Sequence, residues 1–151
     1  MTRIHTFDPG VTTGYALWNT ATKQFEAAAE IKHIEEFARL GRSAAVTEDF
    51  KDDIFVAEQF FLYPGAARKL IWNSMPAAVT MGYVELIASM AGCRLYKQKA
   101  ADMHRIPDKI LFERGGVKQL PHSEHIKDAM RHALYFYFNT WPKIQAKHTQ
   151  G

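Results

Sequence analysis

Three acids that are widely separated in the sequence could together bind a divalent metal ion: Asp8, Glu58 and Asp128. Carboxylates that are brought together repel one another unless a cation lies between them. Hard ions such as Mg²⁺ and Mn²⁺ prefer oxygen ligands of this kind. Two such ions about 4 Å apart can activate a water and stabilise the leaving oxygen in phosphodiester cleavage. This chemistry requires elements that bring the three acids to one place.

Asp8 closes the first apolar stretch of the chain, in RIHTFDPGVTTGYALWN over residues 3–19. We expect a buried strand that ends at this acid, followed by a glycine turn. Asp-Pro-Gly is also a common way to end a strand, so turn chemistry alone could explain the residue. The two explanations differ in whether other acids of the chain can meet Asp8.

Glu58 lies in the apolar run DDIFVAEQFF, which has the length of a strand. Side chains alternate along a strand, so Ile54, Val56, Glu58 and Phe60 share one face. An acid within an apolar set is costly to bury unless a neighbouring group neutralises it. A solvent-facing edge strand or a salt bridge to a basic residue is the alternative explanation.

The segment HSEHIKDAMRHALYFYFN, residues 122–139, predicts an amphipathic C-terminal helix. At about 100° per residue, His125 and Asp128 lie only about 60° apart around the helix, and His132 falls between them. Glu124 is the nearest alternative carboxylate, one turn before Asp128. A hydrated helix flank with ordinary charges is the alternative explanation for each residue taken alone.

The remaining pattern predicts an α/β fold with the element order βββαβαβα, in which the three acids could converge. Pro76 should kink or split the long helix expected over 66–91. Prolines and glycines leave the stretch 105–121 without a regular pattern. The expected elements are strands at 3–8, 15–19, 24–31, 52–61 and 93–98, and helices at 33–46, 66–91 and 122–139. This order suggests a mixed sheet with helices packed on its faces.

Length and composition predict one soluble globular domain over residues 1–151, with 47% hydrophobic and 23% charged residues. No apolar run reaches the roughly 20 residues of a membrane span. The first strand begins almost at once, which leaves no room for a secretory signal. Cys93 is the only cysteine, which excludes an internal disulfide and fits a reducing compartment. A net charge of +3 allows a polyanionic partner without requiring one.

Three blocks of the sequence resemble the RuvC-type Holliday junction resolvases of the RNase H-like nuclease superfamily. FDPGVTTGYALW is similar to the family's first-strand block, with Asp8 as the metal-binding acid. VAEQFF is similar to its fourth-strand block, with Glu58 as the acid and Phe61 at the aromatic position. HIKDAMRHAL is similar to the start of its terminal helix, with His125 and Asp128 as ligands. The resemblance implies an RNase H-like mixed five-stranded sheet with helices on both faces.

The resemblance also implies a function. It suggests an endonuclease that resolves four-way DNA junctions by paired symmetric nicks, with two Mg²⁺ or Mn²⁺ ions per active site. It implies a homodimer, because MGYVELIASMAG around Gly82 fits the helix that builds the family's two-fold interface. A plain core helix is the alternative for this segment. We expect a phage or divergent bacterial protein in the cytoplasm of a bacterium or phage-infected host.

The DNA contacts are less well defined by the resemblance. The basic segment that usually precedes the last helix of this family is not obvious, and basic residues are scattered through the corresponding stretch. A longer segment than usual separates Glu58 from Gly82. The candidate DNA-binding residues are Phe61, Arg68, Lys69, Lys97, Lys99 and Arg105.

Three other classes of protein share part of this pattern. The phosphate-binding loop of actin-like ATPases also opens with an acid, a glycine and threonines, but those proteins close two domains around a nucleotide. A YqgF-like or RNA-cleaving RNase H-like nuclease is a second alternative. A catalytically inactive DNA-binding module on the same fold is the third. The long helix around Gly82 and the full set of acids favour the resolvase.

Overall fold

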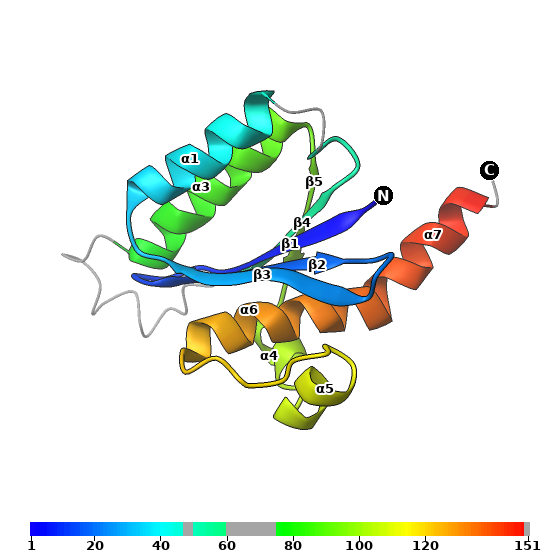
Figure 1. Ribbon diagram of the computed structural model, residues 1–151. Coiled ribbons are helices and arrows are strands. Elements are labelled where there is room, and N and C mark those ends of the chain that lie inside the picture. The colour runs from blue at the N-terminus through cyan, green and yellow to red at the C-terminus, as the bar shows by residue number, and fades with distance from the viewer. Residues whose placement is uncertain (47–49, 60–74, 150–151) are drawn as a thin grey trace.

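The computed structural model describes residues 1–46, 50–59 and 75–149. Its centre is a five-stranded sheet in the order β3-β2-β1-β4-β5 (Figure 1). The strands are β1 (Arg3–Asp8), β2 (Thr13–Asn19), β3 (Gln24–Ile31), β4 (Ile54–Glu58) and β5 (Arg94–Gln98). The first three form an antiparallel meander, and β4 and β5 run parallel to β1. The predicted mixed five-stranded sheet is confirmed.

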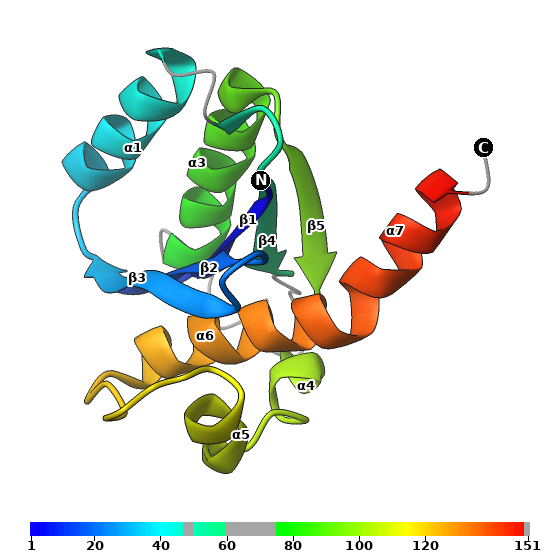
Figure 2. The same ribbon diagram turned by 45° about the vertical axis from the view of Figure 1, so that its right-hand side comes forward.

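Helices cover both faces of this sheet, as predicted (Figures 1 and 2). On one face lie α1 (Ile34–Val46) and α3 (Pro76–Ala91). On the other face lies α6 (Glu124–Tyr135), which continues through the π-helical turn η2 (Phe136–Thr140) into α7 (Trp141–Thr149). Two short helices, α4 (Ala100–Met103) and α5 (Asp108–Glu113), pack against α6 on the side away from the sheet.

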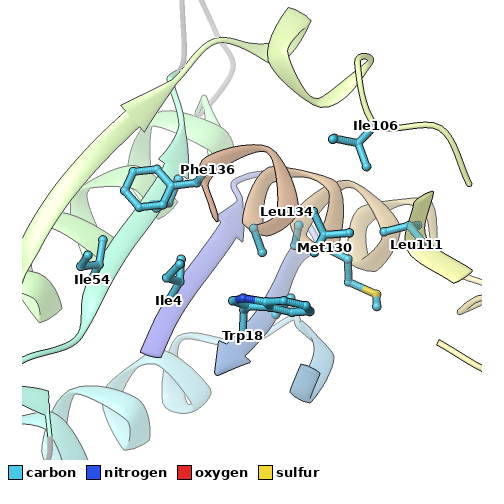
Figure 3. Close-up of a cluster of buried hydrophobic side chains, with 12 residues drawn as sticks. Ile4, Trp18, Ile54, Ile106, Leu111, Met130, Leu134 and Phe136 are labelled. Atoms are coloured by element: carbon cyan, nitrogen blue, oxygen red, sulfur yellow. The ribbon is translucent and has the colours of Figure 1, made fainter. Parts of the chain in front are cut away.

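The alternation of side chains along β1 divides the core into two clusters. Ile4 packs with Trp18, Leu134 and Phe136 between the sheet and α6 (Figure 3). Phe7, on the other face of β1, packs with the residues that α1 and α3 contribute. Residues of one parity on β1 therefore face α6, and those of the other parity face α1 and α3.

Pro76, which was predicted to kink or split a helix, lies at the start of one. This proline is in the first turn of α3, which begins there after the N-cap residue Met75. A proline is tolerated at that position because the first N–H groups of a helix have no intrahelical partner. The residues 66–74 of the predicted helix lie outside the described part of the chain.

Two other predictions near the C-terminus were incomplete. The last helix was expected to end at residue 139, but helical structure runs on to Thr149. The stretch 105–121 contains α5, which begins after Pro107 and ends before Gly115. Pro107 precedes the first turn of this short helix and Gly115 follows its last turn. A six-residue helix is too short to show a periodic apolar pattern in the sequence. Among the described residues, no helix has the length and apolar character needed to cross a membrane.

Candidate active site

Asp8 and Glu58 lie at the same edge of the sheet, at the C-terminal ends of β1 and β4. The two strands are parallel neighbours, and Phe7 pairs with Ala57 immediately before the two acids. Both acids have the parity of the residues that face α6. Their side chains retain 13% and 24% exposure, so a ligand can reach them from solvent.

Three local features determine how α6 begins and how closely it packs on this edge. The Ser123 side chain caps the helix by accepting the N–H of Ile126 at 3.4 Å. The buried hydroxyl of Thr6 donates to the Ala129 carbonyl at 2.8 Å, which ties β1 to α6. Gly14 of β2 permits the closest approach, because a Cβ at this position would lie 1.8 Å from the His125 carbonyl oxygen.

This close approach brings His125 to Asp8, with Nδ1 of the ring 3.0 Å from the carboxylate Oδ2. Burial raises the pKa of Asp8 above its usual range, and the negative charges of Glu58 and Asp128 raise it further. The hydrogen bond from His125 acts in the opposite direction. Glu58 of β4 and Asp128 of α6 therefore both act electrostatically on Asp8 of β1.

Glu58 has a partner that the sequence analysis did not assign. The ring of His132 is fully buried, and its Nε2 lies 3.1 Å from Oε2 of Glu58. On the other side, Nδ1 lies 2.6 Å from Oε1 of Gln98, at the end of β5. The position of His132 beside Asp128 on the helix was visible in the sequence. The register that brings it to Glu58 and Gln98 was not.

Asp128 has a basic partner one turn further along α6. Arg131 contacts its carboxylate at 2.5 Å and also forms an ion pair with Asp108 of α5. Glu124, the alternative ligand, is 67% exposed, forms an ion pair with Lys127 and lies 3.6 Å from Arg131. The hydrogen bond with Lys127 lowers the pKa of Glu124. His125 rather than Glu124 therefore contacts Asp8.

The donor set of this edge fits a hard divalent cation. It combines three carboxylates with the His125 imidazole. Burial is the main cause of the raised pKa of Asp8, and the negative charges of Glu58 and Asp128 add to it. A bound cation would favour the ionised carboxylate. In the described part of the chain, no three or more His, Cys, Asp or Glu side chains are grouped so that they could hold a metal ion as they stand. The acids are instead paired with His125, His132 and Arg131.

The candidate DNA-binding residues are not all at this edge. Lys97 lies on the other face of β5, where it pairs with Glu85 of α3 at 2.6 Å. Lys99 is the N-cap of α4, and the Arg105 guanidinium lies 5.9 Å from the centre of the Tyr135 ring of α6. The other three candidates, Phe61, Arg68 and Lys69, lie outside the described residues.

The order of the strands, with helices on both faces, defines an RNase H-like fold. The solved structure of Thermus thermophilus RuvC in complex with a Holliday junction substrate matches with a TM-score of 0.69 and 18% identity. The match covers 96% of this chain and 97% of that one. Another structure of Thermus thermophilus RuvC gives 0.68 and 17%, with 95% and 96% covered. No family model and no curated protein matches the sequence.

Proposed function

We propose that this protein is a divalent-metal-dependent endonuclease that resolves four-way DNA junctions by paired symmetric nicks. The observation that carries the proposal is that Asp8 and Glu58 end neighbouring parallel strands and that α6, which carries His125 and Asp128, packs against these strands. One structure with this fold is a RuvC in complex with a Holliday junction substrate. The proposal treats residues 1–151 as one nuclease domain that acts in the cytoplasm of a bacterium or phage-infected cell.

Asp8, Glu58, Asp128 and His125 are the residues that would hold Mg²⁺ or Mn²⁺, with two ions per site. The ions would supply an activated water and stabilisation of the leaving oxygen. His132 orients the Glu58 carboxylate through its Nε2. Thr6 keeps α6, and with it Asp128, in register with β1. Arg131 forms ion pairs with both Asp128 and Asp108, so it can fix the position of the Asp128 carboxylate that would bind the metal.

The DNA would approach the edge where the acids are exposed. Lys99 and Arg105 lie near the end of β5 on the α6 side and are the described candidates best placed for phosphate contacts. Lys97 is less suited, since its ammonium group is paired with Glu85. Phosphate contacts of this kind position the nucleic acid and make binding depend on salt.

A homodimer completes the proposal, because a junction has two strands to nick symmetrically. α3 exposes an apolar stripe at helical spacing, with Val79 46%, Leu86 58% and Met90 50% exposed. Gly82 lies on the same stripe, and nothing stands within 4 Å of the place where its Cβ would be. A groove of about 310 Å³ between α1 and α3 adjoins Leu86 and Met90. A second copy of α3 is the occupant that we propose for this surface.

A cleavage assay on labelled four-way junction, flap, linear duplex and RNA–DNA hybrid tests the function. We expect junction cleavage with Mg²⁺ or Mn²⁺, none in EDTA, and binding with little cleavage in Ca²⁺, which is larger and coordinates more flexibly. Products should carry a 5′-phosphate and a 3′-hydroxyl. Full activity in chelator would overturn the metal assignment. Equal cleavage of linear duplex would indicate a general nuclease, and preference for the hybrid would indicate an RNA-cleaving relative.

A further inference from the structure

A groove lies at the opposite end of the sheet from Asp8. It has a volume of about 550 Å³, within the range of ligand-binding pockets. Trp18 of β2, Lys23 after it, Arg114 after α5, Phe138 of η2 and Trp141 of α7 line it. At about 1.5 Å per helical residue, Trp141 stands about 20 Å along the helix from Asp128.

The charge of this groove is one-sided. Its lining includes the cations Lys23 and Arg114 and no acid. Both side chains are exposed, and neither forms an ion pair with another residue that the structure describes. The Arg114 guanidinium lies 5.1 Å from the centre of the Phe138 ring, a cation–π arrangement that fixes its position. The groove therefore favours an anionic ligand.

Aromatic rings gather at the same place. Tyr137 and Phe138 come from the π-helical turn, and Trp141 follows it directly. π-Helical turns are rare in proteins, and those that occur are often found at functional sites. Tyr137 contacts both Phe138 and Trp18, with ring centres 5.2 and 5.4 Å apart. A ligand with flat rings can stack on aromatic side chains placed in this way.

Trp18 adds an independent observation. Its side chain is fully buried beneath the groove, and its indole N–H finds no acceptor among the described residues. A buried donor without an acceptor is unfavourable, because it has lost its hydrogen bonds to water. Trp18 is one of the residues that line the groove, so this unpaired donor belongs to its lining.

We infer that this groove binds an unpaired strand of nucleic acid, with phosphates on Lys23 and Arg114 and a base stacked against the aromatic rings. Alternating anionic groups and flat rings are the features of a single strand that match this lining. In a duplex the flat faces of the bases are stacked on one another, so they are not available to aromatic side chains of a protein. The inference goes beyond the proposed nuclease, because the groove is remote from Asp8, Glu58 and Asp128.

The test measures fluorescence anisotropy of a labelled oligothymidine of about 12 nucleotides, in EDTA so that no cleavage occurs. We expect Arg114→Glu and Lys23→Glu each to weaken binding about tenfold. Each should also reduce the slope of log affinity against log salt by about 0.7, the value for one phosphate contact on a single strand. Arg39→Glu, which makes the same change of charge on the exposed side of α1, is the control and should change binding much less.

Trp141→Leu separates stacking from charge, since it keeps an apolar side chain but removes the ring. We expect weaker oligonucleotide binding with an unchanged salt slope, at a thermal midpoint close to that of the wild type. Absence of oligothymidine binding in the wild type would overturn the inference. So would equal losses in Arg114→Glu and Arg39→Glu, or a duplex of the same length that binds as well and loses as much in Arg114→Glu. These results do not depend on junction cleavage, so the proposed function stands or falls separately.

Discussion

Nε2 of His132 lies 3.1 Å from Oε2 of Glu58, and this buried contact determines how the acid is presented. The opposite nitrogen contacts Oε1 of Gln98. With Glu58 ionised, both contacts are satisfied by an imidazolium, or by a neutral ring if the Gln98 amide is turned over. Either arrangement puts a proton on Nε2, so the ring donates to the carboxylate. Hydrogen bonds of this kind orient metal-binding carboxylates.

His132→Leu should therefore reduce metal-dependent cleavage by about 10–100-fold and raise the Mg²⁺ concentration needed for half-maximal rate. His132→Gln keeps an N–H donor near Glu58 and should recover part of the activity. The measurements are cleavage rate against Mg²⁺ concentration and the thermal midpoint of each variant. If His132→Leu and His132→Gln lose the same activity, in proportion to their loss of stability, His132 only fills the core.

Asp8→Asn tests whether the acid at the end of β1 is a metal ligand or a turn residue. If Asp8 only shapes a turn, Asn should replace it well. If Asp8 is a metal ligand, the loss of its charge should lower the cleavage rate by several orders of magnitude while junction binding is retained. Asp52→Asn, an exposed acid before β4, is the control. Cleavage by Asp8→Asn at near the wild-type rate would leave turn formation as the only explanation for Asp8.

The same variant should be more stable than the wild type in EDTA near neutral pH. Burial raises the pKa of Asp8 in the fold, so the ionised carboxylate favours the unfolded chain. Wild-type stability from this group therefore decreases as the pH rises through the folded pKa. We expect the difference in thermal midpoint between variant and wild type to shrink as the pH is lowered. A variant less stable than the wild type at neutral pH would contradict this sign.

Gly14→Ala should be strongly destabilising, because the added Cβ would lie 1.8 Å from the His125 carbonyl oxygen. Overpacking of this kind costs on the order of 3 kcal/mol. It should also reduce cleavage, since α6 must move away from β1. Gly82→Ala is the matched control, with nothing within 4 Å of the new methyl group. Denaturant unfolding measures both, and equal midpoints would show that α6 does not need the glycine.

Gly82→Arg and Leu86→Glu test the dimer that we propose at α3. Both positions are exposed, so neither change should unfold a monomer. A charge on each side of a two-fold interface should separate the copies, and the monomers should bind junctions poorly. Sedimentation at micromolar concentration measures the oligomeric state. A wild type that is monomeric and fully active would remove the argument for symmetric nicking.

A buried cluster on the other face predicts a pH dependence of stability. His5 lies 2.9 Å from both Asp53 and the Tyr15 hydroxyl. Burial lowers the pKa of His5 below its ordinary value of 6.5, although Asp53 acts against this. The unfolded chain then binds more protons, so stability decreases as the pH falls below about 6.5. The positive charge of Arg3 also lowers the pKa of His5, whereas the negative charge of Glu26 raises it.

His5→Gln should therefore flatten the fall of the thermal midpoint between about pH 7.5 and pH 5. His33→Gln, at an exposed position before α1, should not. Asp53 does not titrate in this window. Burial raises its pKa, but hydrogen bonds from His5 and Arg3 bring it below the usual 3.8. An unchanged slope in His5→Gln would mean that other groups cause the acid sensitivity.

The sequence was sufficient to predict the sheet and the strand end at Asp8, but it placed Glu58 inside a strand over 52–61, whereas β4 ends at this residue. Apolar alternation sets the face of each side chain, and strand termini follow from the turn residues. It was not sufficient for Gln98 and His132, because their contact with Glu58 depends on the register between α6 and the sheet. Arg131 meets Asp108 across a stretch where prolines and glycines obscured the short helix α5. α7 was missed because its residues lack the apolar stripe of α6.

The alternation along β1 has a consequence for how such a protein can change over generations. Thr6 and Asp8 face α6, while His5 and Phe7 face the opposite layer. Substitutions on α1 and α3 can alter what the protein assembles with while the acids keep their positions. Substitutions on α6 act on the acids and leave the exposed stripe of α3 as it is. Neighbouring residues of one strand thus belong to two surfaces that selection can adjust separately.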